Sequence, residues 1–364
     1  MRCPTLAELP VPPPGKTGWP WTEEVPPLPE AMPDGRPWPK FSIVTPSYNF
    51  EKFLEMTIRS VLLQGYPDLE YIVIDGGSTD GSVAIVRKYE KWLSHWASER
   101  DSGPEEASNK GFRKATGELM AWLGSDDIYL PGALGVAAQE MSRQPDCCVI
   151  NGDARARDGC GRVLEVIRAG EVTRDRLVRF WTKPPYYALP ATVAVFFRRR
   201  VVEEVGLMNE KLRVVSDYEW WLRMIQKFPF HYVPHLFSEF CLHPAAKSAA
   251  FKTNAFENTL DAELTAVSRL YWGAPTKWRF WWMWTECHVY WVRVWFHRSK
   301  SAWLTSSYSA YAAGRRVCCL AWLLAVFIRS PVYSIRGGGI GLALRALAGE
   351  ARERRLKRWL RWKR

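Results

Sequence analysis

Residues 41–82 decide the fold class, and they read FSIVTPSYNFEKFLEMTIRSVLLQGYPDLEYIVIDGGSTDGS. The apolar runs Phe41–Thr45 and Leu69–Ile74 each predict a short buried strand. Between them, Phe50–Gln64 carries apolar residues at helical spacing. Strands alternating with helices of about 12 residues indicate βαβ units, and therefore an α/β, Rossmann-like fold with a mainly parallel sheet and flanking helices. The sequence after residue 82 continues this pattern. We expect helices at 82–93 and 105–116, a strand at 118–123, a helix whose first residue is Pro131, and a helix at 216–227.

Polar segments follow three of the predicted strands. They are PSYN at 46–49, DGGSTDG at 75–81 and GSDD at 124–127. Each segment taken alone is also what an ordinary turn or helix cap contains. Because ligands of open α/β sheets bind beyond the carboxyl ends of the strands, three such segments on one sheet edge predict a binding site.

The residue types in these segments suit a nucleoside diphosphate. The Asp75 carboxylate is a strong acceptor for the N–H of a base, and the Tyr48 ring can lie against a base or ribose. Asp126 and Asp127 supply the oxygen ligands that a hard divalent cation, Mn²⁺ or Mg²⁺, prefers. Such a cation stabilises the negative charge that grows on a departing diphosphate.

The order and spacing of the motifs resemble the family 2 inverting glycosyltransferases with the GT-A fold. The resemblance covers residues 41–243 and implies transfer of a sugar from a nucleotide-diphosphate sugar to a hydroxyl acceptor. The matching segments are SIVTPSYN (42–49), EYIVIDGGSTDGS (70–82), SERDSG (98–103), NKGFRKATGEL (109–119), GSDDIYLPGAL (124–134) and SDYEWWLR (216–223).

The resemblance also implies a role for individual residues. The implied metal ligands are Asp127, Asp126 and His243, although His243 can equally be a structural histidine. The chain departs from the family pattern at two places. Gly124 stands where relatives often have Asn, and the segment GPEEAS (103–108) also differs. Both differences put the choice of sugar donor in question. The implied donor-binding residues are Pro46, Tyr48, Asn49, Asp75, Asp101, Lys110 and Asp126.

Inversion at the sugar requires a base that takes the proton from the acceptor hydroxyl. Asp217 matches the position of the family's base, at the start of a predicted helix, although the family often has Glu-Asp where this chain has Ser216-Asp217. The alternative role of Asp217 is a helix cap. Glu219 is a second candidate base, but two residues further along a helix it points about 200° away.

The regions on either side of residues 41–245, the expected catalytic domain, differ from it in composition. Residues 1–40 contain 12 of the 25 prolines and predict an extended, poorly ordered arm that its tryptophans attach to the body. Residues 246–364 predict a helical, aromatic and basic region. The net charge is +12, and residues 351–364 alone hold eight Lys/Arg and one Glu. We therefore expect binding to an anionic membrane surface and no nucleic acid, with a solvated tail or a helical subdomain packed on the core as the alternatives.

The expected location is the cytoplasm, at the cytoplasmic face of a membrane. The eight cysteines show no regular spacing, which favours reduced thiols, and the N-terminus lacks the apolar segment of a secretory signal. The longest apolar run, 317–328, is too short to span a bilayer.

Two other functions compete with glycosyl transfer to a glycan or lipid-linked glycan in polysaccharide biosynthesis. A sugar nucleotidyltransferase needs a glycine-rich basic loop after the first strand, and PSYNFEKF is not such a loop. A non-catalytic sugar-nucleotide-binding protein would have no need for the acidic set that this chain retains, Asp75, Asp126, Asp127 and Asp217.

Overall fold

The computed structural model describes residues 1–159, 161–182, 190–243 and 254–290. The chain divides into two compact units, Met1–Gly273 and Ala274–Arg364. The first unit is built on one sheet, whose described strands are β1 Phe41–Ser47, β2 Leu69–Asp75, β3 His95–Ser98, β4 Leu119–Trp122, β5 Ile128–Tyr129, β6 Val149–Asp158, β7 Val163–Ile167, β8 Val195–Arg198 and β9 Phe230–Leu242.

The strands lie in the order β3-β2-β1-β4-β8-β6-β9-β5, and β7 pairs with β6 outside this path. β3, β2, β1 and β4 run parallel to one another, as the alternating sequence pattern predicts. β8 is antiparallel to both β4 and β6, whereas β6 and β9 are parallel. The parallel half therefore carries the three polar segments to one edge of the sheet.

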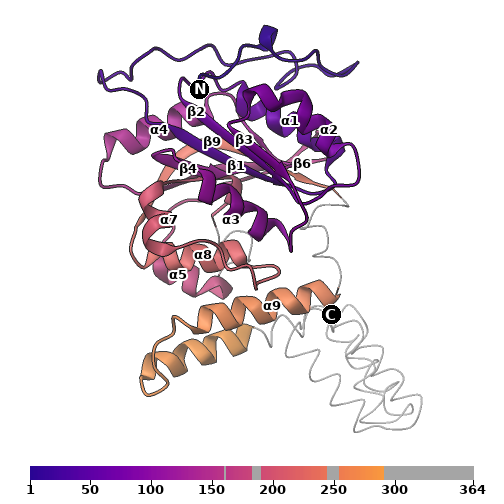
Figure 1. Cartoon of the computed structure of the whole chain (residues 1–364). Helices are drawn as coiled ribbons and strands as arrows, with labels where there is room; N and C mark the ends of the chain where they lie inside the picture. Colours follow the sequence, from indigo (N-terminus) through magenta and orange to yellow (C-terminus); the bar gives the residue numbers. More distant parts are fainter. Residues whose placement is uncertain (160, 183–189, 244–253, 291–364) are drawn as a thin grey trace, which may run out of the picture. The chain divides into compact units, whose positions relative to one another are not determined.

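Helices cover both faces of the parallel half (Figure 1). Ile43 of β1 belongs to a buried cluster with Leu54 and Ile58 of α1, whereas the neighbouring Val44 lies against Gly111 of α3. Alternate strand residues thus face opposite layers. The helices are α1 Glu51–Leu62, α2 Ser82–Tyr89, α3 Pro104–Lys114, α4 Ala133–Arg143, α5 Arg174–Val178, α7 Arg199–Val205, α8 Ser216–Ile225 and α9 Asn254–Arg269.

Helix α4 corrects one boundary predicted from the sequence. Pro131 does not open the helix, because Gly132 stands between them as the N-cap with a φ of +79°. Glycine adopts this left-handed conformation without steric cost, and it turns the chain into the helix two residues later than the proline suggests.

The N-terminal arm is also different from the prediction. Residues 1–40 are described throughout, and Cys3, Trp21 and Trp38 are buried. The guanidinium of Arg59, itself fully buried on α1, donates to the carbonyl groups of Pro10, Pro20 and Trp21. An ordered arm is the result, because these backbone acceptors compensate a buried charge. The expectation that tryptophans attach the arm is confirmed.

Helix α9 holds the segment that leads into α8. The Glu263 carboxylate accepts hydrogen bonds from the backbone N–H groups of Arg213, Val214 and Val215 at 2.9–3.2 Å. Since the first N–H groups of a helix have no partner within it, an acidic side chain near this end stabilises α8.

The described part of the second unit is short. Residues 278–290 are helical. Within the described ranges, no helix combines the length and apolarity needed to cross a bilayer. The basic stretch 351–364 and the apolar run 317–328 lie outside the described residues.

Candidate active site

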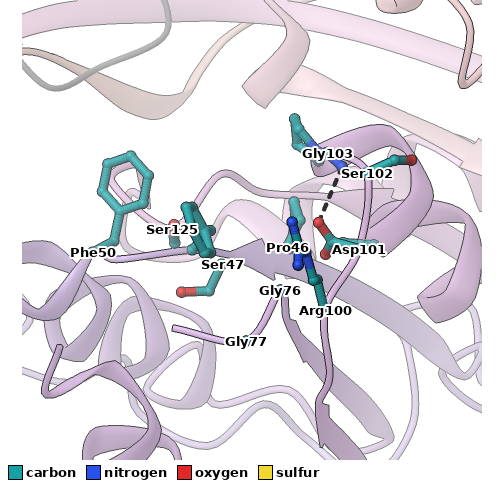
Figure 2. Close-up of a pocket in the computed structure, with 13 residues that line it drawn as sticks. Pro46, Ser47, Phe50, Gly76, Gly77, Arg100, Asp101, Ser102, Gly103 and Ser125 are labelled. Carbon is teal, nitrogen blue, oxygen red and sulfur yellow. Dashed lines mark hydrogen bonds between the residues drawn. The ribbon is translucent and has the colours of Figure 1, made fainter. Parts of the chain in front are cut away.

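A cavity of about 720 Å³ opens at the carboxyl ends of the parallel strands (Figure 2). The register places Ser47 of β1 directly beside Asp75 of β2, so the loops that follow these strands are neighbours. The lining residues come from the ends of all four parallel strands and from the start of α3: Pro46, Ser47, Tyr48, Phe50, Gly76, Gly77, Arg100, Asp101, Ser102, Gly103, Pro104, Ala107 and Ser125.

The loop after β1 is fixed by the loop after β2. The Asn49 N–H donates to Ser78 Oγ at 2.8 Å, and Asn49 Oδ1 accepts from the Thr79 N–H at 2.8 Å. Asn49 has a φ of +58°, a conformation that Asn tolerates better than most residues. Tyr48 is left exposed at the cavity wall, where its ring is accessible to a ligand.

Asp75 lies beneath the cavity and is fully buried. One carboxylate oxygen accepts from the Ser78 hydroxyl at 2.5 Å. The other accepts from the N–H groups of Gly77 and Ser78 and from the Ser98 hydroxyl. These four bonds make Asp75 the residue that shapes the loop after β2.

Asp101 faces the cavity, whereas Lys110 does not line it. Burial raises the pKa of the Asp101 carboxyl, while the Gly103 N–H, 3.0 Å away, opposes that rise. A Cβ on Gly76 would lie 2.7 Å from Asp101 Oδ2, so only glycine permits this close approach. Lys110 forms ion pairs of 3.0 Å with Glu99 and with Glu106.

Asp126, Asp127 and His243 gather next to the cavity. His243 Nε2 lies 3.1 Å from Asp126 Oδ2. Asp127 Oδ1 accepts from the Cys241 N–H at 3.1 Å. The imidazole stacks on Phe53 with ring centroids 4.2 Å apart and meets the edge of Phe50, which itself lines the cavity.

The pKa values of the Asp126 and Asp127 carboxyls are both raised above their usual values. Burial raises the pKa of Asp127 well above its usual value, and the negative charge of Asp126 raises it further. Burial also raises the pKa of Asp126, and His243 opposes that rise. The buried Arg157 guanidinium donates to the Asp126 carbonyl at 3.1 Å, and its Nε has no hydrogen-bond partner among the described residues.

The side chains of this cluster are of the chemical types that bind divalent cations. Two carboxylates and an imidazole are ligands that Mn²⁺ accepts, and a cation would lower the raised pKa values of the carboxyls. One carboxylate oxygen of each aspartate lies close to Gly124. A Cβ atom at that position would be 2.7 Å from Asp127 Oδ2 and 3.0 Å from Asp126 Oδ1, so a side chain there would crowd both carboxylates. Among the described residues, no three His, Cys, Asp or Glu side chains lie so that they could hold a metal ion together, so a cation here would need phosphate and water oxygens as further ligands.

Asp217 lies in the first turn of α8, where its carboxylate accepts hydrogen bonds from a side chain and from a backbone N–H group. Its Oδ2 accepts from the Thr192 hydroxyl at 2.9 Å, and its Oδ1 accepts from the Tyr218 N–H at 2.7 Å. The N-cap of α8 is Val215, so Asp217 is not the capping residue. Ser216, beside it, donates to Glu105 of α3 at 2.6 Å, and this bond links α8 to the helix that lines the cavity.

Glu219 is committed to another partner. Its two carboxylate oxygens accept from Nε and Nη2 of Arg223 at 2.7 and 2.9 Å. Both oxygens of this buried carboxylate therefore already accept hydrogen bonds from one guanidinium group.

Several residues of the site carry no signal in the sequence. Arg100 and Ser102 line the cavity from the loop after β3, and both belong to the SERDSG segment, in which only Asp101 was given a role. Arg157 and Thr192 reach the acidic residues from strands and loops that are distant in sequence. Strand β6, which contains Arg157, also carries Asp153, Arg155 and Asp158, so its composition does not single out Arg157 as a buried charge.

Comparison with known proteins identifies the family. The model of "Glycosyl transferase family 2" matches residues 42–206. The putative teichuronic acid biosynthesis glycosyltransferase TuaG of Bacillus subtilis is 41% identical over 193 residues, which are 52% of this chain and 73% of that protein. The chain belongs to glycosyl transferase family 2. This is the family that the sequence motifs resemble.

Other family 2 relatives match a similar share of this chain. A PGL/p-HBAD biosynthesis glycosyltransferase of Mycobacterium bovis is 28% identical over 191 residues, 51% of this chain and 69% of that protein. An uncharacterized glycosyltransferase of Rickettsia conorii is 26% identical over 194 residues, 52% of this chain. The chain spans only 32% of the length of that Rickettsia conorii protein and 33% of its Rickettsia felis counterpart.

Solved structures confirm the GT-A fold. The structure of S. aureus TarS residues 1–349 in complex with UDP has a TM-score of 0.51 and 18% identity, covering 86% of this chain and 91% of that one. The same protein in complex with UDP-GlcNAc has a TM-score of 0.50.

Proposed function

We propose that this family 2 member is an inverting glycosyltransferase that uses a nucleotide-diphosphate sugar. The observation that carries the proposal is the cavity at the carboxyl ends of the parallel strands, with Asp101 in its wall and the Asp126-Asp127 pair beside it. Pro46, Tyr48 and Asn49 would contact the nucleotide, Asp75 would support the loop that holds its base, and Lys110 would lie at the outer end of α3. The two competing functions, nucleotidyl transfer and non-catalytic sugar-nucleotide binding, gain no support from the family match.

Asp217 would act as the base. Its carboxylate takes the proton of the acceptor hydroxyl while that oxygen bonds to the anomeric carbon of the sugar. The bond from this carbon to the diphosphate breaks at the same time, and the diphosphate leaves with the electron pair. The configuration at the anomeric carbon therefore inverts.

Asp126, Asp127 and His243 would hold a divalent cation, Mn²⁺ or Mg²⁺. When bound, the cation would stabilise the negative charge on the departing diphosphate. The proximity of Phe50 to both His243 and the cavity supports this placement, because it brings the proposed cation ligands to the wall that the donor would contact.

The acceptor would be a glycan or a lipid-linked glycan. The relationship to a protein named for teichuronic acid biosynthesis supports a role in making a surface polysaccharide. A peripheral position at the cytoplasmic face of a membrane would suit such an acceptor, and the net charge of +12 favours an anionic surface.

The test is a screen of uridine, guanosine and thymidine diphosphate sugars with Mn²⁺ or Mg²⁺, read by nucleoside diphosphate release. NMR of the product then gives the anomeric configuration. We expect release with one nucleotide class, loss of release with excess chelator, and an inverted product. A retained configuration would refute the inverting mechanism, and full activity in chelator would refute the role of the cation.

A further inference from the structure

The helix at residues 278–290 has two faces of opposite character. Phe280, Met283 and Cys287 are buried, with at most 5% of each side chain exposed. Their spacing of three and four residues places them on one side of the helix. The helix therefore has one buried side, which these three side chains share.

The outward face is made of tryptophan. Trp278 is 78% exposed, Trp281 55%, Trp282 57% and Trp284 38%. Trp278, Trp281 and Trp282 are also three and four positions apart, and they extend along the side away from Met283. Tryptophan is rarely left in water to this extent, and four indoles within seven residues form an exposed apolar patch of the kind that marks an interaction site.

The tryptophans and the basic residues beside them favour a lipid surface as the partner of this exposed patch. Tryptophan is enriched at the level of lipid headgroups, where the indole ring has one apolar side and one N–H donor. Lys277 and Arg279 are exposed beside the indoles and would meet anionic headgroups. A protein partner would need an apolar groove that is complementary in shape to these indoles. A bilayer needs only a helix that lies parallel to its surface with the apolar face toward the lipid.

We propose that the tryptophan face of residues 278–290 lies in the headgroup region of an anionic bilayer. The proposal specifies the surface behind the membrane association put forward above, and it is independent of the donor site. The indoles supply the apolar part of the binding, and the basic side chains supply the part that salt weakens.

The test is co-sedimentation of the full chain with vesicles of phosphatidylcholine, with and without phosphatidylglycerol. One variant combines Trp278→Ser, Trp281→Ser and Trp282→Ser. Its matched control, Val163→Ser, Leu164→Ser and Val166→Ser, removes three other exposed apolar side chains, from β7. We expect the tryptophan variant to bind the anionic vesicles on the order of 100-fold more weakly, while the control binds as the wild type does.

A second variant separates charge from apolar contact. Lys277→Gln with Arg279→Gln should weaken binding about fivefold for each charge at low salt and should reduce the effect of added salt. Nucleoside diphosphate binding and melting temperature should be unchanged in every variant, so a failure of the donor assignment would show up separately. Wild-type binding by the tryptophan variant would overturn the proposal. So would a change of oligomeric state in that variant without a change in vesicle binding, because the face would then be a contact between copies of this chain.

Discussion

Asp217→Asn separates the two roles that the sequence allows for this residue. The substitution keeps the size of the side chain and removes its ability to take a proton. The local structure can be retained: the amide oxygen can accept from the Tyr218 N–H, and the amide nitrogen can donate to the Thr192 hydroxyl, which lies 2.9 Å from Oδ2. The Glu105–Ser216 hydrogen bond does not involve Asp217 and should persist.

Because the hydrogen bonds to Thr192 and Tyr218 can persist, the expected loss of turnover rate comes only from the loss of the proton acceptor. General-base catalysis contributes a factor of about 10² to 10⁴, which corresponds to about 2.7–5.4 kcal/mol of transition-state stabilisation. We expect the turnover rate to fall by this factor. Donor affinity should be unchanged, since Asp217 is not among the residues that line the cavity. The free energy of unfolding should change by less than about 0.5 kcal/mol.

The assay measures rate, donor affinity by calorimetry and melting temperature on the same preparation. Glu219→Gln is the matched control, because it removes a carboxylate from the same helix. It should lower the free energy of unfolding by about 1–3 kcal/mol through the lost charge pair with Arg223, and leave the turnover rate of the folded enzyme intact. An Asp217→Asn enzyme with wild-type turnover would refute the assignment of the base.

Three further substitutions test the rest of the site and the arm. Asp127→Asn should abolish metal-dependent turnover. The pKa of Asp127 is raised in the folded state, so the metal-free wild type loses stability as pH rises above the unfolded value of about 3.9 and through the folded pKa. In melts without metal at neutral pH the variant should therefore be the more stable protein, and Mn²⁺ should stabilise only the wild type; a variant that Mn²⁺ stabilises equally would contradict the metal site. Asp75→Asn cannot accept all four hydrogen bonds that the carboxylate accepts, so nucleotide affinity should fall by about 1.5–3 kcal/mol and stability by about 1–3 kcal/mol, and calorimetry that shows unchanged affinity would count against its role. Arg59→Met leaves the carbonyl groups of the arm without a buried donor, which should cost about 2–4 kcal/mol and expose residues 1–40 to limited proteolysis; an equally resistant arm would show that Arg59 does not hold it.

The parallel half of the sheet was predictable because its signals are local. The runs at 41–45 and 69–74 are continuous and apolar, and such strands must be buried on both faces. The polar segments that follow them had to meet at one edge, since parallel strands share their carboxyl ends. Tyr48 follows the first of these strands and lines the cavity, whereas Asp101, which also lines it, was assigned from the family resemblance because the sequence pattern did not predict the strand before it.

The remaining features depend on contacts between residues that are far apart in sequence. A proline-rich stretch usually predicts disorder, but here Arg59 holds the arm from 38 and 49 residues away. Lys110, which the family resemblance assigns to the donor pocket, forms ion pairs with Glu99 and Glu106. The sequence motifs do not show which hydrogen-bond or ion-pair partner a charged side chain will have in the folded protein.

The placement of Asp217 shows how the two halves of the site are connected. Helix α3 begins at the cavity with Gly103 and Pro104, and one residue later Glu105 receives the hydroxyl of Ser216. Further along the same helix, the Asn109 amide bonds to both the carbonyl and the N–H of Met208, on the segment between α7 and α8. A shift of α3 caused by an occupied cavity would therefore be transmitted to the first turn of α8 through two buried hydrogen-bonded connections. Helix α3 in this way links the wall of the cavity to the start of the helix that carries Asp217, and Glu105 of the GPEEAS segment makes one of the two connections.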